Sequence, residues 1–194
     1  DLSLPNNMAI CLSGDFDPEE TLEIIKKYFG GMQTNENLPK LEFSAEEPIT
    51  KPIVKEVLGL EAENVTLAWR TFAAADPKSD VAQIAASILS IGQAGLNDLD
   101  LQQKQKVLGA YAYNSAMSDY GCFELYGRPK DGQTLEEVRD LLLEELAKLR
   151  NGDFDESLLK AGVDNYKLSM QRYLDSNSGR ADAFVDAFIN GISW

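Results

Sequence analysis

The sequence AYAYNSAMSDYGCFELYG, residues 110–127, decides the fold class of this chain. Its two ends, 110–117 and 121–127, combine aromatic with small apolar residues, which is typical of strands. The tripeptide SDY between them suits a turn, because Ser and Asp side chains bond to nearby backbone groups. We therefore predict two antiparallel strands joined as a β-hairpin.

Three stretches upstream predict further strands. The run MAICLSG, residues 8–14, is continuously apolar and ends at Gly, as expected of a central strand covered on both faces. The stretch NVTLAWRTFA, residues 64–73, alternates larger apolar side chains with Thr, Ala and Arg. The stretch IVKEVLGL, residues 53–60, precedes it, and the intervening EAEN suits a second hairpin. Residues 32–52, which precede the predicted strand at 53–60, are rich in polar residues and Pro and predict a long irregular connection.

A helix is predicted directly after residues 8–14. Asp17 is a good N-cap, Pro18 suits the first helical position, and Glu20 stands three residues after the cap. The pair of glycines at 30–31 ends the pattern. The apolar stripe of this helix comprises Leu22, Ile25, Tyr28 and Phe29.

The remaining helices alternate with the later strands. One is predicted within residues 76–92, with Gly92 as its stop, and a short amphipathic helix follows within 93–109. The apolar face of the first of these comprises Val81, Ile84, Ala85, Ile88 and Leu89.

Three helices complete the chain. Thr134 and Glu137 form a capping box for the first, Asp155 precedes the second, which ends near Leu174, and the third lies within residues 179–194. The apolar stripe of the first comprises Leu135, Val138, Leu141, Leu142, Leu146 and Leu149, and that of the second Leu158, Leu159, Val163, Tyr166, Met170 and Tyr173.

The order of elements is strand, helix, hairpin, two helices, hairpin and helices. This order indicates an α+β fold, with a mostly antiparallel sheet and helices packed on one face. The length of 194 residues fits a single domain, residues 1–194. The missing initiator Met leads us to expect a fragment of a longer chain.

The charge balance narrows the range of partners. The chain has 18 basic and 32 acidic residues, a formal net charge of −14, and the acidic residues are spread along its length. Such a field repels phosphate backbones and anionic lipid heads, so we expect neither nucleic acid nor a bare membrane surface as a partner. No apolar run approaches the length that spans a bilayer.

The chain contains no His. Histidine is the commonest general base and the commonest zinc ligand, so catalytic triads built on His and the usual catalytic zinc sites are excluded within this chain. A metal site made only of carboxylates, or a pair of catalytic carboxylates, remains open.

The tetrapeptide GDFD occurs at residues 14–17 and again at 152–155. Paired carboxylates of this kind suggest a metal site, an acid/base pair or helix caps. The first copy starts like a calcium loop, but Pro18 follows and the Gly and Glu that complete such a loop are missing. Because each copy directly precedes an apolar helical stripe, we interpret Asp17 and Asp155 as caps.

Other polar and aromatic features allow two interpretations each. The alternating Tyr residues of 110–121 could stack on a substrate, or form a half-buried sheet surface. Arg70 and Arg128 could bind a carboxylate, or mark the solvated ends of strands. Cys11 and Cys122 lie in apolar stretches and are expected to be buried free thiols or a single bridge between neighbouring strands.

The segments in this order resemble the second, non-zinc domain of the M16 peptidase family, which includes insulinase, pitrilysin and the mitochondrial processing peptidase. LPNNMAICLSGDFDPEETLEIIKKYFG, residues 4–30, is similar to the opening strand and helix of that domain. LQQKQKVLGAYAYNSAMSDYGCFELYG, residues 101–127, is similar to its L-R-E-x-x-x-L-A-Y segment and hairpin. Residues 134–166 resemble its closing helices, so the resemblance covers almost the whole chain.

The resemblance implies a fold and a role. The fold is the metallohydrolase-like M16 domain. The role is that of a catalytically inactive domain that helps to enclose an unfolded peptide and supports a zinc-bearing domain in cis or in trans. Zinc would be held by that partner domain through H-x-x-E-H, and this chain would carry no cofactor. A bacterial periplasm or cell envelope is the compartment that the resemblance suggests.

The resemblance also suggests substrate-binding residues. In some non-zinc halves, an Arg and a Tyr near the R-E-x-x-x-L-A-Y segment contact substrate. Tyr111 matches the Tyr, whereas Gln102 or Gln103 occupies the Arg position and Gly109 intrudes before Ala110. Two other functions remain open: a structural interaction module of an M16-like assembly without a peptidase role, and a hydrolase that uses carboxylates alone.

Overall fold

The structure is a computed structural model and describes residues 4–38 and 42–193. The chain divides into two compact units, Asp1–Leu60 and Glu61–Trp194, and each is described by itself.

The first unit contains two short regular elements, the 3₁₀ helix η1, Pro5–Asn7, and the helix α1, Pro18–Phe29. The Asp17 side chain accepts hydrogen bonds from the backbone N–H groups of Glu19 and Glu20, both at 2.9 Å, so it satisfies two donors that the first turn leaves unpaired. In the described residues Glu20 takes part only through its backbone. The helix ends at Phe29, directly before the two glycines, and the predicted boundaries are therefore confirmed.

The strand predicted at residues 8–14 does not form, and that prediction was wrong. Met8, Ile10 and Leu12 are exposed, and none of the residues 8–14 belongs to a β-ladder. An apolar run becomes a strand only where a neighbouring strand accepts its backbone hydrogen bonds. Within the described residues of the first unit no strand is present to do so.

The strand predicted at residues 53–60 is likewise not formed. Its large apolar side chains are exposed, with Val54 at 89%. The predicted hairpin with the next stretch was therefore wrong, although the irregular connection before it is confirmed for the described residues. The EAEN sequence satisfied only the local requirement for a turn, whereas strand pairing needs a second chain segment with matching register.

The second unit is built on a three-stranded antiparallel sheet: β1, Val65–Thr71; β2, Gly109–Ala116; and β3, Gly121–Arg128, in the order β1-β3-β2. The predicted hairpin of residues 110–127 is confirmed as β2 and β3. Strand β1 joins the far side of β3, so that Leu67 lies opposite Leu125 and Trp69 opposite Phe123. The rings of Trp69 and Phe123 meet edge to face, 6.4 Å apart.

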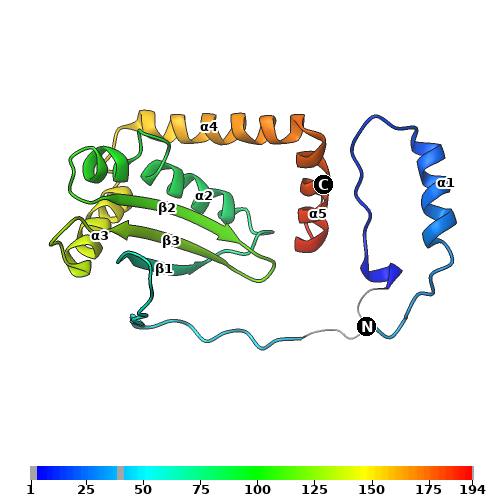
Figure 1. The fold of residues 1–194 in the computed structure, drawn as a ribbon, viewed down its shortest axis with the longest axis horizontal. Coiled ribbons are helices and arrows are strands. Elements are labelled where there is room, and N and C mark those ends of the chain that lie inside the picture. Colours follow the sequence, from blue (N-terminus) through cyan, green and yellow to red (C-terminus); the bar gives the residue numbers. More distant parts are fainter. Residues whose placement is uncertain (1–3, 39–41, 194) are drawn as a thin grey trace. The chain divides into compact units, whose positions relative to one another are not determined.

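Helices cover one face of this sheet. They are α2, Lys78–Leu89, the π-helical turn η2, Asn97–Gln102, and α3, Leu135–Asn151. Figure 1 shows α2 running beside β2. The core between sheet and helices comprises Ala82, Ala86, Ile88, Leu89, Leu96, Leu101, Val107, Ala110, Ala112, Phe123, Leu125, Val138 and Leu142. The predicted α+β fold with helices on one face is thus confirmed.

The buried face of α2 differs from the predicted one. Ala82 and Ala86 are buried with Ile88 and Leu89, whereas Val81 is 67% exposed. The helix passes close to the sheet, and the small alanines permit that approach. The helix ends at Leu89, and Gly92 follows in the left-handed conformation, with φ 56°.

The two last helices are α4, Glu156–Asp175, and α5, Asn177–Asn190. Helix α4 packs on α2 and on α5, and Gly162 lies against Ser87. Leu159, Met170 and Tyr173, which were predicted to face inward, remain exposed because α4 has neighbours along only part of its surface. In the described part of the chain no helix is both long and apolar enough to cross a membrane.

Candidate functional site

The face of the sheet opposite the helices carries a row of tyrosines. Side chains alternate along a strand, so Ala110, Ala112, Phe123 and Leu125 enter the core while their neighbours point the other way. Tyr111 and Tyr113 of β2 are 52% and 46% exposed. We call the set of Tyr111, Tyr113, Glu124 and Tyr126 the tyrosine face.

Two cross-strand pairs organise the tyrosine face. Tyr111 lies opposite Tyr126, and their rings stack with centroids 6.2 Å apart and an interplanar angle of 29°. Tyr113 lies opposite Glu124 and donates its hydroxyl hydrogen to the Glu124 carboxylate. This hydrogen bond, with smaller effects of burial and of the carboxylate's charge, raises the pKa of Tyr113. The face therefore presents aromatic rings around one carboxylate.

Strand β1 borders the tyrosine face with Ala68 and Arg70. Ala68 lies opposite Glu124, which leaves the carboxylate without a large neighbour on that side. Arg70 lies opposite Cys122, and its guanidinium sits 5.0 Å from the centre of the Tyr120 ring, at the turn end of the hairpin. Arg128 is exposed at the other end of β3.

Both cysteines are half-buried free thiols. Cys122 belongs to the same side of β3 as Glu124, and its pKa is raised, chiefly by burial and further by the Glu124 carboxylate. A raised pKa keeps the thiol protonated near neutral pH and lowers its nucleophilicity. Cys122 is therefore a poor candidate for a catalytic nucleophile.

The structure uses the amides of Gln102 and Gln103 for internal hydrogen bonds. The Gln102 amide nitrogen donates to the Ala110 carbonyl at 3.2 Å and to Asp98 at 3.3 Å. The Gln103 amide nitrogen donates to the Gln93 carbonyl at 3.0 Å and to Asp98 at 2.9 Å. Gln102 thus holds the backbone of the residue before Tyr111.

Gln102 also takes part in covering the outer edge of β2. The Ala110 carbonyl is bonded by Gln102, and the Ala112 N–H donates to the Ser90 hydroxyl at 2.8 Å. Asn97, which is fully buried, donates to the same hydroxyl at 3.2 Å. Side chains of α2's C-terminal end and of η2 therefore satisfy backbone groups that an edge strand otherwise exposes.

An ionic cluster fastens η2 to α3. Lys148 contacts Asp100 at 2.6 Å and Glu145 at 2.8 Å, and Lys104 contacts Asp100 at 2.6 Å. The bonds from Lys104 and Lys148 lower the pKa of Asp100 to about 2. Glu145 is only 1% exposed, and its burial raises its pKa in spite of Lys148. Glu145 is buried and the other members of the cluster reach the surface, so the cluster ties η2 to α3 in a structural role.

The predicted caps of the second unit lie at helix ends. The Thr134 hydroxyl accepts from the Glu137 N–H at 3.2 Å, and the Glu137 carboxylate accepts from the Thr134 N–H at 2.9 Å. Asp155 accepts from the Ser157 N–H at 2.8 Å, and the Ser157 side chain, followed by this N–H, lowers the pKa of the Asp155 carboxyl. Both GDFD segments thus end in an Asp that caps a helix.

The residues of this chain do not fit a zinc ion. The sequence has no His, and across residues 4–38 and 42–193 no group of three or more His, Cys, Asp and Glu side chains is arranged to hold a metal. The second aspartate of each GDFD segment, Asp17 or Asp155, accepts hydrogen bonds from backbone N–H groups. We therefore derive no metal chemistry from this chain.

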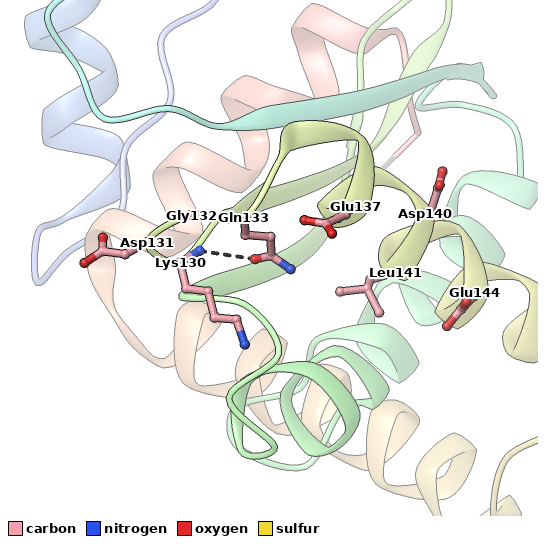
Figure 2. A pocket seen from close by; sticks show the side chains of 8 residues that line it. All are labelled: Lys130, Asp131, Gly132, Gln133, Glu137, Asp140, Leu141 and Glu144. Atoms are coloured by element: carbon pink, nitrogen blue, oxygen red, sulfur yellow. Dashed lines mark hydrogen bonds between the residues drawn. The ribbon is translucent and has the colours of Figure 1, made fainter.

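A surface hollow of about 530 Å³ lies beside the start of α3 (Figure 2). Four acidic side chains line it together with Lys130, Gln133 and Leu141, and Figure 2 shows the bond from the Lys130 N–H to Gln133. Glu137 is already engaged in the capping box. The hollow is wide and acidic, and it offers no convergent set of groups for a ligand. Its acidic residues are Asp131, Glu137, Asp140 and Glu144.

The residues of the tyrosine face were only partly predicted. Tyr111 and Tyr113 belong to the alternating tyrosines for which stacking on a substrate is one interpretation, and only Tyr111 matches a family position, whereas Glu124 and Tyr126 are not predicted. The period-two pattern of ELYG with AYAY contained the signal, because side chains two residues apart in a strand share a face. Which face stays open, however, depends on where the helices pack.

A family model described as the peptidase M16 inactive domain matches residues 3–166. No curated protein matches the chain.

Solved structures share its fold. A protease from Helicobacter pylori is 19% identical with a TM-score of 0.78, over 92% of this chain and 44% of that one. The periplasmic protease PqqL from Escherichia coli is 16% identical with a TM-score of 0.56, over 93% and 21%. A chain of complex III2 from Candida albicans is 16% identical with a TM-score of 0.55, over 68% and 34%. The chain thus spans less than half the length of these three proteins.

Proposed function

Because this chain belongs to the peptidase M16 inactive domain family, we propose that it is the non-catalytic domain of an M16-type zinc metallopeptidase. In this role it contacts and helps to enclose an unfolded peptide, and it supports a separate zinc-bearing domain on the same chain or on a partner. The zinc and its chemistry belong to that other domain.

The tyrosine face is the observation that carries this proposal. Tyrosine offers a large, rigid surface with one polar end, and it is enriched where proteins bind other chains. The stacked pair of Tyr111 and Tyr126 and the neighbouring Tyr113 present such a surface on the side of the sheet opposite α2, η2 and α3. An extended peptide can lie along it without any catalytic group in this chain.

The length of the similar H. pylori protease favours a second domain beside the one formed by this chain. This chain corresponds to 44% of that protein, so the similar structure extends well beyond one domain of this kind. For the compartment we propose the bacterial periplasm or cell envelope, since the similar PqqL from E. coli is a periplasmic protease.

Reconstitution with a zinc-bearing M16 domain tests the proposal. We expect the full chain to bind that domain and to raise its turnover of an unfolded peptide. The variant Tyr111→Ala should weaken peptide binding but leave association with the zinc domain intact. A zinc domain that neither binds the chain nor gains activity from it would refute the proposed role.

An alternative is a structural interaction module of an M16-like assembly without a peptidase role. A mainly apolar groove of about 290 Å³ between α4 and α5 favours it, because Met170, Tyr173 and Ile192 line that groove while still exposed. The similarity to a chain of complex III2 is compatible with such a role.

Variants separate the two functions. In an interaction module, Met170→Glu should abolish assembly, and Tyr111→Ala should have no effect on any activity of the complex. In a peptidase domain, Tyr111→Ala should lower peptide turnover by the reconstituted enzyme. The remaining hypothesis is a hydrolase that uses carboxylates alone. It requires that the isolated chain cleaves peptides after metal removal and that the variant Asp17→Asn loses this activity.

A further inference from the structure

One carboxylate lies in the middle of the tyrosine face without a cationic partner. Within the described residues, Glu124 accepts a hydrogen bond from Tyr113 and affects Cys122, and no ion pair joins it to Lys or Arg. Both neighbours are neutral hydrogen-bond donors at physiological pH, since the pKa values of Tyr113 and Cys122 are raised. The negative charge of Glu124 is therefore uncompensated.

The two arginines on this side of the sheet lie toward its ends. Arg70 is directed to the Tyr120 ring beside the turn, with its guanidinium carbon 5.0 Å from the ring centre. Arg128 lies four residues from Glu124 along β3, which is about 13 Å at the usual rise of a strand. Neither arginine is among the groups that affect the pKa of Tyr113 or Cys122.

The surroundings of Glu124 are suited to a cation. Tyr113 lies opposite Glu124 on β2, Tyr126 lies two residues along β3, and Ala68 of β1 places only a methyl group opposite the carboxylate. Aromatic ring faces attract ammonium and guanidinium groups through their quadrupole, and a carboxylate adds direct charge attraction. The apolar stem of a Lys or Arg side chain can lie on the tyrosine rings at the same time.

We propose that Glu124, together with Tyr113 and Tyr126, forms a subsite for a Lys or Arg side chain of a bound extended peptide. This inference rests on the proposed function and names a specificity for the same face. The overall charge of −14 also attracts basic peptides, but only the subsite selects one side chain at one position of the peptide.

Matched peptides test the subsite. The probes are two extended, otherwise uncharged fluorescent peptides that differ only at one central residue, Lys in one and norleucine in the other. Fluorescence anisotropy measures the affinity of the full chain for each. We expect the Lys peptide to bind about three- to tenfold more tightly, the range for an exposed ion pair combined with a cation–π contact.

Two variants assign the preference to its source. Glu124→Gln keeps an acceptor for Tyr113 and removes the charge, and we expect it to reduce the affinity ratio of the Lys peptide to the norleucine peptide to about one. Glu144→Gln removes the same charge from α3, on the helical side of the sheet, and should retain the preference. Circular dichroism of both variants checks that they fold.

Three results would overturn the subsite. Equal affinity of the wild-type chain for both peptides shows that the face does not select a cation, and the proposed peptide-binding function then stands alone. An equal loss of preference in Glu124→Gln and Glu144→Gln assigns the effect to the net charge. Binding of neither peptide refutes the peptide-binding function as well as the subsite.

Discussion

Tyr113 of β2 and Glu124 of β3 face each other across the hairpin, and the tyrosine hydroxyl donates to the carboxylate on the side of the sheet opposite α2, η2 and α3. The pair joins the most distinctive part of the sequence, the alternating tyrosines, to the only acidic residue of the two strands. Several measurable properties depend on this pair and on the buried contacts behind it.

The ionisation of Tyr113 should respond to Glu124. Its pKa is raised first by the hydrogen bond to Glu124, then by burial and by the carboxylate's charge. We expect Glu124→Gln to lower this pKa, because the variant removes the negative charge that opposes formation of tyrosinate. Titration of the Tyr113 ring carbon by NMR measures the change, and Glu144→Gln should leave it where it is in the wild type.

Acid stability should depend on Asp100. The pKa of Asp100 in the folded state is about 2, below the ordinary value of 3.8. Asp100 therefore adds to the free energy of unfolding at pH values above 3.8, and this addition is lost as the pH falls through the folded-state pKa. We expect a loss on the order of 1–2 kcal/mol from this group between about pH 4 and pH 2. The free energies of unfolding of the wild type and of Asp100→Asn, measured in urea, should converge as the pH falls toward 2. If the difference between the two proteins does not change with pH, the assignment to Asp100 is contradicted.

Removing Lys148 should lower the free energy of unfolding, because the buried Glu145 carboxylate loses its cationic partner. The variant Lys148→Met leaves Glu145 in the core without its cation, which should destabilise the fold by about 3–5 kcal/mol. The pKa of Glu145 should rise further, so the stability of this variant should fall as the pH increases through that pKa.

A second substitution provides the control for Lys148. Adding Glu145→Leu to Lys148→Met removes the unpaired buried carboxylate and should recover much of the stability, which a cycle of urea unfolding experiments can measure. If the double variant is as unstable as Lys148→Met, the loss arises from packing of the lysine stem and not from the carboxylate.

Gly127 should tolerate no side chain. A Cβ atom there would lie 2.4 Å from Val138 Cγ1 and 3.0 Å from Leu142 Cδ1, so β3 and α3 would have to separate. We expect Gly127→Ala to cost about 1–3 kcal/mol in thermal or urea unfolding. Gly59→Ala is the matched control, since no atom lies within 4 Å of its Cβ position, and Val138→Ala should rescue part of the loss.

Local sequence signals predicted the elements that depend on neighbouring residues. Asp17 and Pro18 started α1, and Thr134 with Glu137 started α3, because caps act within one helical turn. The hairpin of β2 and β3 needed only two adjacent apolar stretches and a turn. The same reasoning failed for residues 8–14 and 53–60, where apolar character was read as a strand without a partner for its backbone.

Features set by long-range contacts were not predictable in this way. Val81 and Ala82 are neighbours in sequence, and only the approach of α2 to the sheet determines that the smaller side chain is buried. Likewise Gln102 matched a substrate-binding position in the resemblance, but its amide bonds to the Ala110 carbonyl. The expectation that residues 1–194 form one domain stays a prediction.

The amino-acid sequence by itself determined that this chain has no histidine chemistry, that the second Asp of each GDFD segment caps a helix, and that its hairpin and closing helices are those of an α+β domain of the M16 inactive family. Only the tertiary structure decided that β1 pairs with β3 and that Tyr111, Tyr113, Glu124 and Tyr126 share an open surface. The physical reason is the sequence separation of the interacting residues. A helix cap involves residues within one turn, whereas strand pairing and exposure depend on which distant segments exclude water from each face.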